Sequence, residues 1–362
     1  MLLAKQPDFD VIHFEALGPE AHHLQKATRA KIDQGALPVG HRMMLTPLTV
    51  QAFLSQHSSI AWPSLITTKT HSIVADSFFE SHGQHRPGII TRSAGYDHFE
   101  HLVARAHVTS LRQYCVDAVA QTAMKFVYCI AGSLADYTEK CATFDRKSCE
   151  AFSQLGPHLT LTVFGVGRIG KRVYELAQAN GLTVQGVDVR ESQLHSIYGD
   201  SVRFVSRDHA IRSSHILVNA MNLTKDASSP FFNVGYFSKD FLARSPNPLA
   251  FINVTRGEIA PESGLLELLT NGALVGLGLD VFSHESKLVQ ALDGERVLDF
   301  DILASIQLIA RAQLRTANVY VQPHQAFNSD VAAKTKADEA LVHVVAWFKN
   351  GAQKFDDELP YY

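Results

Sequence analysis

Three glycines in the middle of the chain follow an apolar run and could bind a phosphate group. Residues 159–164 are rich in β-forming side chains and have the length of a buried strand. Gly165, Gly167 and Gly170 follow in G-x-G-x-x-G spacing, which permits a tight strand-to-helix turn and lets the backbone approach a pyrophosphate. The first N–H groups of the helix that follows would attract the phosphate charge. This stretch therefore predicts a phosphate-binding turn.

An acidic residue ends the next predicted strand. Residues 182–187 form a second apolar run, and Asp188 closes it 18 positions after Gly170. A carboxylate at this place can accept a hydrogen bond from a ribose 2′-hydroxyl and would repel a 2′-phosphate. The motif alone is weak and would often be a plain glycine turn, but its whole strand–helix–strand context indicates a dinucleotide site. NAD is the expected cofactor, and Arg190, two positions on, keeps NADP as the alternative.

Three polar residues stand at or just after the ends of later predicted strands. They are Arg256, Asp280 and His324, and Glu285 lies five residues beyond Asp280. An isolated residue of any of these types is usually solvated or caps a helix, but all four fall at the edge where the glycine turn lies. Arginine can hold a carboxylate with two hydrogen bonds, and histidine can exchange the proton that accompanies a hydride. A nearby glutamate raises the pKa of such a histidine, so the set is suited to an oxidoreductase.

Length and composition limit the other possibilities. A chain of 362 residues is long for a single core, so two domains are expected. The net charge of -3 gives no electrostatic reason to bind nucleic acid or an anionic membrane. The four cysteines include no C-x-x-C pair, the first ten residues lack a long apolar core, and no apolar run reaches the length of a membrane span. We therefore expect a cytoplasmic protein with free thiols, and we expect no metal site because H-E-x-x-H is absent.

The order of predicted elements gives the fold class. Strand-like runs alternate with helix-like stretches, which favours parallel sheets covered by helices on both faces. The predicted strands are residues 11–14, 43–45, 65–67, 88–91 and 107–109, and, after Asp188, residues 216–219, 249–253 and 274–279. A strongly amphipathic helix over residues 117–132 is expected to pass between the two domains. The prediction is an α/β protein with two doubly wound parallel-sheet domains.

Several motifs in a fixed order resemble those of a known family. They are RSAGYD at residues 92–97, GVGRIG at 165–170, NVTRGE at 253–258, GLDVFSHE at 278–285 and PHQAFNS at 323–329. With the intervals of 24 residues from Arg256 to Asp280 and 5 from Asp280 to Glu285, the chain resembles the D-isomer-specific 2-hydroxyacid dehydrogenases. Within them it is similar to the D-lactate dehydrogenase branch, and the resemblance covers residues 88–350.

The resemblance implies a domain organisation. It predicts a flavodoxin-like substrate domain made of residues 1–114 and 327–362, with a Rossmann NAD-binding domain inserted as residues 115–326. Catalysis would take place in a cleft between the two domains. Members of the family usually dimerise through the nucleotide domain, so a homodimer is expected.

The resemblance also implies a role for each site residue. His324 would be the acid/base, Glu285 its partner, and Arg256 the residue that binds the substrate carboxylate. The implied cofactor-binding residues are Gly165, Gly167, Arg168, Ile169, Gly170, Asp188, Met221, Asn222, Val254, Thr255 and Asp280. The implied substrate-binding residues are Ala94 and Gly95 through their backbone N–H groups, Arg256, and the side-chain pocket residues Tyr114 and Phe327.

The chain departs from the family pattern in two regions. Asn222 stands where the family has a proline, and Ala227 stands where it has a hydroxyl or amide. The span from Glu285 to His324 is 39 residues, which is longer than in most members and includes an amphipathic stretch over residues 298–314. These departures affect a cofactor contact and the loop geometry more than the expected reaction class.

The expected activity is NAD-dependent reduction of a small 2-keto acid to the D-2-hydroxy acid, or the reverse. An NAD(H)-sensing module of the corepressor type is the alternative from another functional class. A hydroxypyruvate- or phosphoglycerate-type dehydrogenase is the closer alternative. The sequence leaves open the preferred keto acid, the physiological direction and the oligomer size.

Overall fold

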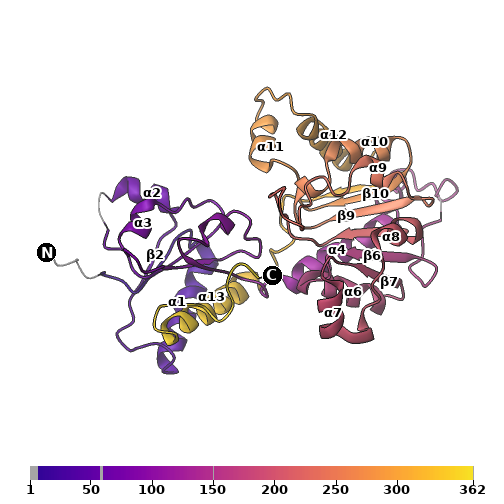
Figure 1. The fold of residues 1–362 in the computed structure, drawn as a ribbon. Helices are drawn as coiled ribbons and strands as arrows, with labels where there is room; N and C mark the ends of the chain where they lie inside the picture. The colour runs from indigo at the N-terminus through magenta and orange to yellow at the C-terminus, as the bar shows by residue number, and fades with distance from the viewer. Residues whose placement is uncertain (1–6, 58–59, 150, 362) are drawn as a thin grey trace. The chain divides into compact units, whose positions relative to one another are not determined.

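The computed structural model describes residues 7–57, 60–149 and 151–361, and it divides the chain into two compact units. Unit 1 comprises Met1–Cys115 and Asn328–Tyr362, and unit 2 comprises Val116–Phe327 (Figure 1). The chain thus begins and ends in unit 1, with unit 2 inserted. Most of the N-terminal stretch that was expected not to be a secretory signal lies outside the described residues.

Unit 1 contains a parallel sheet with strand order β2-β1-β3-β4-β5. Its strands are β1 (Val11–His13), β2 (Met43–Leu45), β3 (Leu65–Thr68), β4 (Gly88–Thr91) and β5 (His107–Ser110). The order reverses beside β1, which is the doubly wound arrangement of flavodoxin-like sheets. Strands β1, β3 and β4 are short and fully buried because helices cover the sheet, whereas the edge strand β2 is half-buried.

The helices of unit 1 come from both ends of the chain. They are α1 (Gly18–Asp33), α2 (Val50–Gln56), α3 (Asp76–Glu80), the 3-10 turn η1 (Glu100–Leu102) and α13 (Ala332–Lys349). The C-terminal α13 packs along α1. Its apolar stripe, which includes Leu341, Val344 and Trp347, is completely buried against Leu24 of α1 and the sheet. The C-terminal segment is therefore part of the core of unit 1.

Unit 2 contains a parallel sheet with strand order β11-β10-β9-β8-β6-β7. Its strands are β6 (Thr160–Phe164), β7 (Thr183–Val187), β8 (Ile216–Asn219), β9 (Leu249–Asn253), β10 (Leu274–Leu279) and β11 (Val319–Val321). The order reverses between β6 and β8, and ligands of such sheets bind at the carboxyl ends of the strands beside this point. The predicted fold class, two doubly wound parallel sheets, is confirmed.

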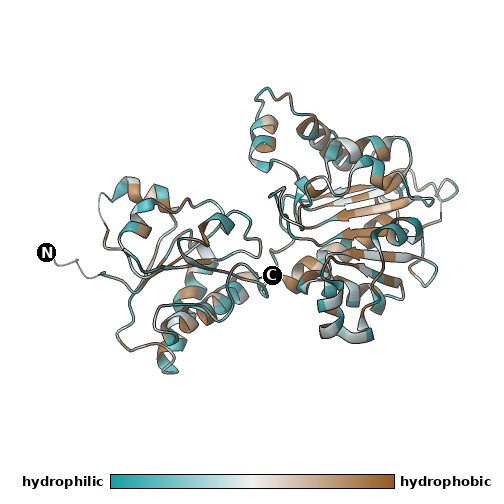
Figure 2. Cartoon of the chain, viewed as in Figure 1, coloured by the Kyte–Doolittle hydropathy of each residue, from teal (hydrophilic) through white to brown (hydrophobic). Residues whose placement is uncertain are grey.

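Helices cover both faces of the sheet in unit 2. They are α4 (Val116–Ala131), α5 (Leu134–Lys140), α6 (Arg168–Ala179), α7 (Glu191–Tyr198), α8 (Arg207–Ser213), α9 (Lys239–Leu242), α10 (Glu262–Thr270), α11 (Glu285–Leu292) and α12 (Phe300–Leu314), with the 3-10 turns η2 (Gly199–Ser201) and η3 (Gly257–Ile259). Helix α4 packs on β9, β10 and β11 and beside α6, whereas α10 packs against α12. Apolar residues follow the strands in Figure 2, and polar residues mark the outer sides of the helices.

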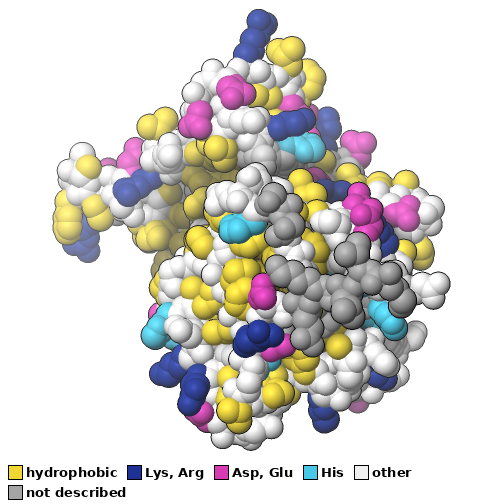
Figure 3. All heavy atoms as spheres, turned by 90° about the vertical axis from the view of Figure 1, so that its left-hand side faces the viewer, with side chains coloured by type: hydrophobic (Ala, Val, Ile, Leu, Met, Phe, Trp, Pro, Cys, Tyr) yellow, Lys and Arg dark blue, Asp and Glu magenta, His cyan; other side chains and the backbone are white. Residues whose placement is uncertain are grey.

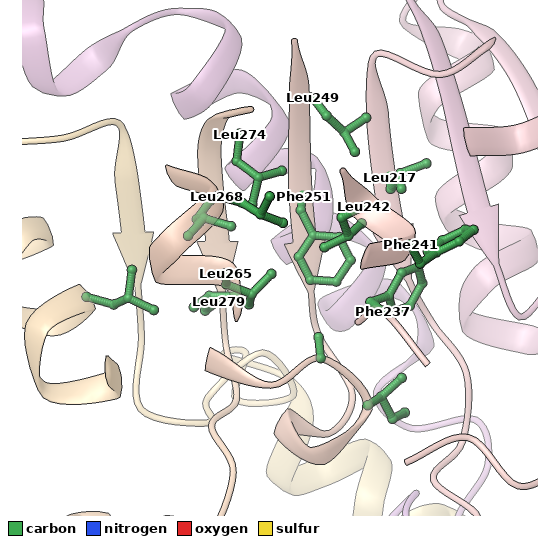
Figure 4. Close-up of a cluster of buried hydrophobic side chains, with 14 of the residues drawn as sticks. Leu217, Phe237, Phe241, Leu242, Leu249, Phe251, Leu265, Leu268, Leu274 and Leu279 are labelled. Carbon is green, nitrogen blue, oxygen red and sulfur yellow. The ribbon is translucent and has the colours of Figure 1, made fainter. Parts of the chain in front are cut away.

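A large apolar core fixes the strands of unit 2 in place. Figure 4 shows the aromatic side chains of Phe237, Phe241 and Phe251 beside leucines from β9, β10 and α10. The rings of Phe237 and Phe251 pack at a tilted angle of 58° with their centroids 4.9 Å apart. Burial of each such side chain contributes about 2 kcal/mol. The carboxyl ends of the strands are therefore rigid supports for the residues that follow them.

Among the described residues, no single helix has the length and apolarity to cross a membrane, whereas α4 and α5 meet that test of length and composition only as a pair bent by 51°. On the face shown in Figure 3, basic and acidic side chains are interspersed among apolar ones. All four cysteines have free thiols.

Candidate active site

The glycine turn has the geometry that its spacing predicts. Gly165 has φ +85°, and a Cβ there would lie 2.8 Å from the backbone of Met221. A Cβ on Gly170 would lie 1.9 Å from the carbonyl oxygen of Gly165, so only glycine allows α6 to approach β6 this closely. No heavy atom lies within 4 Å of the Cβ position of Gly167, which leaves its backbone accessible to a ligand. Arg168 begins α6 immediately after this glycine.

Asp188 is fixed beside the glycine turn at the end of β7. Its Oδ2 atom accepts a hydrogen bond from the Val166 N–H at 2.8 Å, and its Oδ1 atom accepts one from the Arg190 N–H at 2.9 Å. The Nε atom of Arg190 lies 3.7 Å from the same Oδ1. The carboxylate that was expected to bind ribose is thus oriented by the turn itself, next to a guanidinium. Ile169, another predicted cofactor residue, is half-buried on the first turn of α6.

Two buried asparagines connect the ends of β8 and β9. The Nδ2 atom of Asn219 donates to Oδ1 of Asn253 at 3.0 Å and to Oγ1 of Thr255 at 2.9 Å. Asn253 donates from Nδ2 to the carbonyl of Arg256 at 2.9 Å. The Met221 N–H donates to Asn219 Oδ1 at 3.1 Å. This network holds Met221, Thr255 and Arg256 at one sheet edge, and the sequence analysis did not identify either asparagine.

A third asparagine fixes the segment that departs from the family pattern. The Nδ2 atom of Asn233 donates to the carbonyl of Asn222 at 2.6 Å, and its Oδ1 atom accepts from the Thr224 N–H at 2.8 Å. A side-chain amide therefore orders the segment in which the family has a proline. Ala227 is exposed farther along the same loop.

His324 and Glu285 are brought into direct contact. The Nδ1 atom of His324 lies 2.9 Å from Oε2 of Glu285, although 39 residues separate them. Both side chains are partly exposed. His324 has φ +50° and His284, just before Glu285, has φ +53°. Non-glycine residues rarely adopt this left-handed conformation, and it is concentrated at functional sites.

The surroundings of Glu285 favour its ionised form. Burial alone would raise the pKa of Glu285, but the hydrogen bond and charge of His324, the Phe282 N–H group and the charge of Arg256 together lower it. Arg256 therefore acts on the same carboxylate that holds His324. An ionised glutamate stabilises an imidazolium beside it, so this pair is suited to proton donation by His324.

Asp280 holds the loop that contains His324. It is 1% exposed, and its Oδ1 atom accepts from Nε2 of Gln322 at 2.6 Å and from the N–H groups of Gln325 and Ala326 at 2.8 and 3.0 Å. The carbonyl of Asp280 accepts from the His324 N–H at 2.7 Å. Burial raises the pKa of this carboxyl above its usual range. One of its oxygens is thus bonded to the loop, and the expected contact of Asp280 with the cofactor stays a prediction.

The turn before Glu285 is held from two sides. A Cβ on Gly257 would lie 2.0 Å from the Phe282 carbonyl carbon and from the Ser283 nitrogen, so η3 contacts this peptide directly. Glu262, which is 1% exposed, accepts from the Ser283 N–H at 2.7 Å, and burial raises its pKa to about 7. Its second oxygen is buried with no hydrogen-bond partner among the described residues. The loop of Arg256 and the loop of Glu285 therefore pack directly against each other.

The predicted substrate residues fall in both units. Ala94 and Gly95 lie in unit 1, where Ser93 donates from Oγ to the Gly95 carbonyl at 2.7 Å. Tyr114 is also in unit 1, and its N–H donates to Oε2 of Glu339 at 2.7 Å. Phe327 is half-buried at the end of unit 2, and Val254 is buried after β9. Within the described ranges, no group of three or more His, Cys, Asp or Glu side chains could hold a metal ion.

Comparisons with known proteins agree with this architecture. Residues 133–326 match the family model described as D-isomer specific 2-hydroxyacid dehydrogenase, NAD binding domain. A D-lactate dehydrogenase of Staphylococcus epidermidis is 24% identical over 266 residues, which cover 70% of this chain and 73% of that protein. A D-3-phosphoglycerate dehydrogenase of Bacillus subtilis is 34% identical over 128 residues, covering 35% of this chain and 23% of that protein. The structure of D-lactate dehydrogenase from Aquifex aeolicus complexed with NAD and lactic acid is similar in fold, with a TM-score of 0.72 and 20% identity over 94% of this chain and 96% of that one.

Proposed function

The chain belongs to the D-isomer specific 2-hydroxyacid dehydrogenase family, and we propose that it reduces a 2-keto acid to the D-2-hydroxy acid, as D-lactate dehydrogenases do. It is an NAD-dependent oxidoreductase with the NAD-binding domain of that family at residues 133–326. The observation that supports the proposal most directly is the 2.9 Å contact between His324 and Glu285 at the carboxyl edge of the sheet.

In the proposed reaction, His324 donates a proton to the keto oxygen of the substrate. Its Nδ1 atom faces Glu285, so Nε2 is the atom that delivers the proton. The ionised Glu285 keeps the imidazole protonated before the transfer and stabilises its orientation. NAD, when bound in its reduced form, would supply the hydride for this reduction. In the opposite direction His324 takes the proton from the hydroxyl group.

Arg256 and the loop after β4 would bind the carboxylate of the substrate. A guanidinium can donate two parallel hydrogen bonds to a carboxylate, which fixes the keto group relative to His324. The backbone N–H groups of Ala94 and Gly95 would supply further donors, and Tyr114 and Phe327 would contact the substrate side chain. Gly165 to Gly170 would approach the pyrophosphate of NAD, and Asp188 its adenosine ribose. The open space at Gly167 supports the first of these two roles.

An NADH-oxidation assay tests the function. The keto acids are pyruvate, phenylpyruvate, 2-ketoisocaproate, oxaloacetate, glyoxylate and hydroxypyruvate, each measured with NADH and with NADPH, and the configuration of the product is determined. We expect NADH-dependent formation of a D-2-hydroxy acid. Binding of NADH without turnover of any keto acid would contradict the proposal and favour an NAD(H)-sensing module. A strong preference for hydroxypyruvate would favour the phosphoglycerate-type alternative.

We also propose that the chain forms a homodimer through the nucleotide domain and that it is located in the cytoplasm. Sedimentation equilibrium of the full chain, with and without NADH, tests the first of these. A mass of one chain under both conditions would contradict it.

A further inference from the structure

A series of hydrogen bonds connects the surface of unit 2 with the carboxyl edge of its sheet. The Nζ atom of Lys125, which is exposed on α4, donates to Oε1 of Gln322 at 2.6 Å. Gln322 is half-buried directly after β11, and its Nε2 atom donates to Oδ1 of Asp280 at 2.6 Å. An ammonium group at the surface is thus connected through one amide to the buried carboxylate that holds the His324 loop.

Close packing of α4 on the sheet brings Lys125 to Gln322. A Cβ on Gly278 would lie 2.6 Å from the Cβ atom of Phe126, so only glycine in β10 permits this approach of the helix. Helix α4 also packs on β11. The Gln322 N–H donates to the carbonyl of Leu279 at 3.0 Å, which continues the parallel pairing of β11 with β10. The backbones of both residues are therefore held by regular elements.

The two partners of Gln322 allow only one orientation of its side-chain amide. The carbonyl oxygen faces the ammonium group of Lys125, and the NH2 group faces the carboxylate of Asp280. A reversed amide would place the NH2 group against the ammonium and the oxygen against the carboxylate, and both contacts would be repulsive. Hydrogen bonds to charged groups are about twice as strong as those between neutral groups. Lys125 therefore determines which atom of Gln322 meets Asp280.

The two oxygens of the Asp280 carboxylate have different surroundings. Oδ1 accepts from Nε2 of Gln322 and from the N–H groups of Gln325 and Ala326. In the part of the chain that the structure describes, no group donates a hydrogen bond to Oδ2. Because three donors already surround Oδ1, a donor that belongs to a ligand must approach Oδ2. The donors to Oδ1 also fix the plane of the carboxylate and thus the position of Oδ2.

We propose that Gln322 and Lys125 are positioning residues, which orient Asp280 so that its Oδ2 atom accepts a hydrogen bond from the carboxamide of nicotinamide. The inference deepens the proposed function and rests on the expected contact of Asp280 with the cofactor. A carboxamide offers two N–H donors, and Oδ2 is an acceptor without a donor of its own. The His324 N–H donates to the carbonyl of the same Asp280 at 2.7 Å. Asp280 would therefore align the nicotinamide ring with the loop of the proton donor.

A cofactor analogue tests the inference by binding alone. In the 3-acetylpyridine analogue of NADH, an acetyl group replaces the carboxamide, so the oxygen acceptor stays and both N–H donors are lost. We expect the unmodified protein to bind NADH about 10-fold more tightly than the analogue, as the loss of a hydrogen bond to a charged group implies. Calorimetric titration gives both Kd values. Equal values would mean that Asp280 does not accept from the carboxamide and would overturn the inference.

Replacement of Gln322 should remove this preference. We expect Gln322→Leu to raise the Kd for NADH about 10-fold and to leave the Kd for the analogue nearly unchanged, because only the carboxamide uses the oriented oxygen. Gln290→Leu, at an exposed position of α11, is the matched control. A residue with a merely structural role would weaken the binding of both dinucleotides alike. An unchanged ratio of the two Kd values in folded Gln322→Leu protein would overturn the inference.

Replacement of Lys125 tests the same series from its exposed end, where a substitution leaves the core intact. Lys125→Met should lower the ratio of the two Kd values about 3-fold, because the amide of Gln322 loses the partner that sets its orientation. Lys125→Arg should keep the ratio, since arginine also donates to the amide oxygen. The control is Lys239→Met, which removes an exposed lysine that pairs with Glu267 at 3.0 Å. An unchanged ratio in Lys125→Met would overturn the role of Lys125.

A double substitution shows whether the two residues act in series. Lys125→Met should have no further effect on the ratio in Gln322→Leu protein, because the amide through which Lys125 acts is absent. Independent effects of the two substitutions would contradict the proposed series.

The ratio of Kd values does not depend on turnover, so it separates the inference from the proposed function. If no keto acid is reduced, the proposed function fails, whereas the ratio still decides the inference. If a keto acid is reduced and none of the variants changes the ratio, the inference fails and the proposed function stands.

Discussion

The Nδ1 atom of His324 lies 2.9 Å from the Oε2 atom of Glu285. The two residues follow β11 and β10, which are neighbours in the sheet, so parallel pairing of these strands brings the side chains together. The loop of His324 is held by Asp280, and the turn of Glu285 is held by Gly257 and Glu262. The contact is therefore fixed by the sheet and its loops before a substrate arrives.

Replacement of the histidine should remove the proton donor. We expect His324→Ala to lower kcat for keto acid reduction by about 10² or more, because general acid catalysis contributes at least this much. The Kd for NADH should stay near the value of the unmodified enzyme, as measured by fluorescence titration. His209→Ala, an exposed histidine on α8, is the control. An unchanged kcat would remove His324 from the proposed mechanism.

Replacement of the glutamate should shift the pH profile. In Glu285→Gln the imidazolium loses its negative partner, so reduction should decline at a lower pH than in the unmodified enzyme. The sign follows because an opposite charge stabilises the protonated form. The dependence of kcat/KM on pH measures the effect, with Glu295→Gln in the exposed turn after α11 as the control. Coincident profiles for Glu285→Gln and the unmodified enzyme would contradict this role.

Asp188 should discriminate between the two dinucleotides. Its carboxylate is oriented by Val166 and Arg190 beside the glycine turn. Asp188→Ala should raise the Kd for NADH more than the Kd for NADPH, because the mutation removes a ribose acceptor and the charge that repels a 2′-phosphate. Calorimetric titration with both dinucleotides measures this, and Asp200→Ala in the exposed turn η2 is the control. Equal weakening of both would mean that the carboxylate does not reach the ribose.

Gly257 should not tolerate a methyl group. A Cβ there would meet the Phe282–Ser283 peptide at 2.0 Å, and backbone atoms cannot move aside cheaply. Gly257→Ala should lower the free energy of unfolding by about 3 kcal/mol and impair catalysis, because it separates the Arg256 and Glu285 loops. Urea denaturation measures the first effect. Gly40→Ala, where no atom lies within 4 Å and φ is not positive, should change stability by less than about 1 kcal/mol.

Glu262 should make stability depend on pH. Its folded-state pKa of about 7 lies above the ordinary value of 4.5, so the folded chain binds a proton more tightly than the unfolded chain. The contribution to stability is therefore greatest below pH 4.5 and is lost as the pH rises towards 7, by about 3 kcal/mol in all. Glu262→Gln cannot ionise, so it should gain stability relative to the unmodified protein between pH 5 and 8. Parallel stability curves would show that Glu262 is not responsible.

Local sequence patterns predicted the elements that place the site. Apolar β-rich runs located most strands to within a residue, and the glycine spacing located the turn before α6. The polar residues after β9, β10 and β11 could be expected to share an edge because the strands were expected to be parallel. These predictions depended only on the pattern of apolar residues, the spacing of the glycines and the expected parallel direction of the strands.

Contacts between distant segments could not be predicted in this way. Asn233 orders Asn222, and Glu262 holds Ser283, through side chains that have no local pattern around them. Lys336 was unremarkable in sequence, yet α13 buries it beside Tyr114. The position of Asp280 at a strand end was predicted, but its bonds to the 322–326 loop depend on how that loop folds back. Such roles become visible only when tertiary packing is known.

Helices α11 and α12 lie in the segment that connects β10 to β11, which are neighbouring strands of the sheet in unit 2. Helix α11 begins at Glu285, shortly after β10, and β11 then pairs in parallel with β10. The buried face of α12, which includes Ile302 and Leu308, packs on the core, whereas residues 293–296 between the helices are exposed. New chain ends opened at Gly294 would leave both helices and the His324–Glu285 contact intact. A reporter domain inserted at this point is therefore expected to leave the catalytic edge of the sheet unchanged.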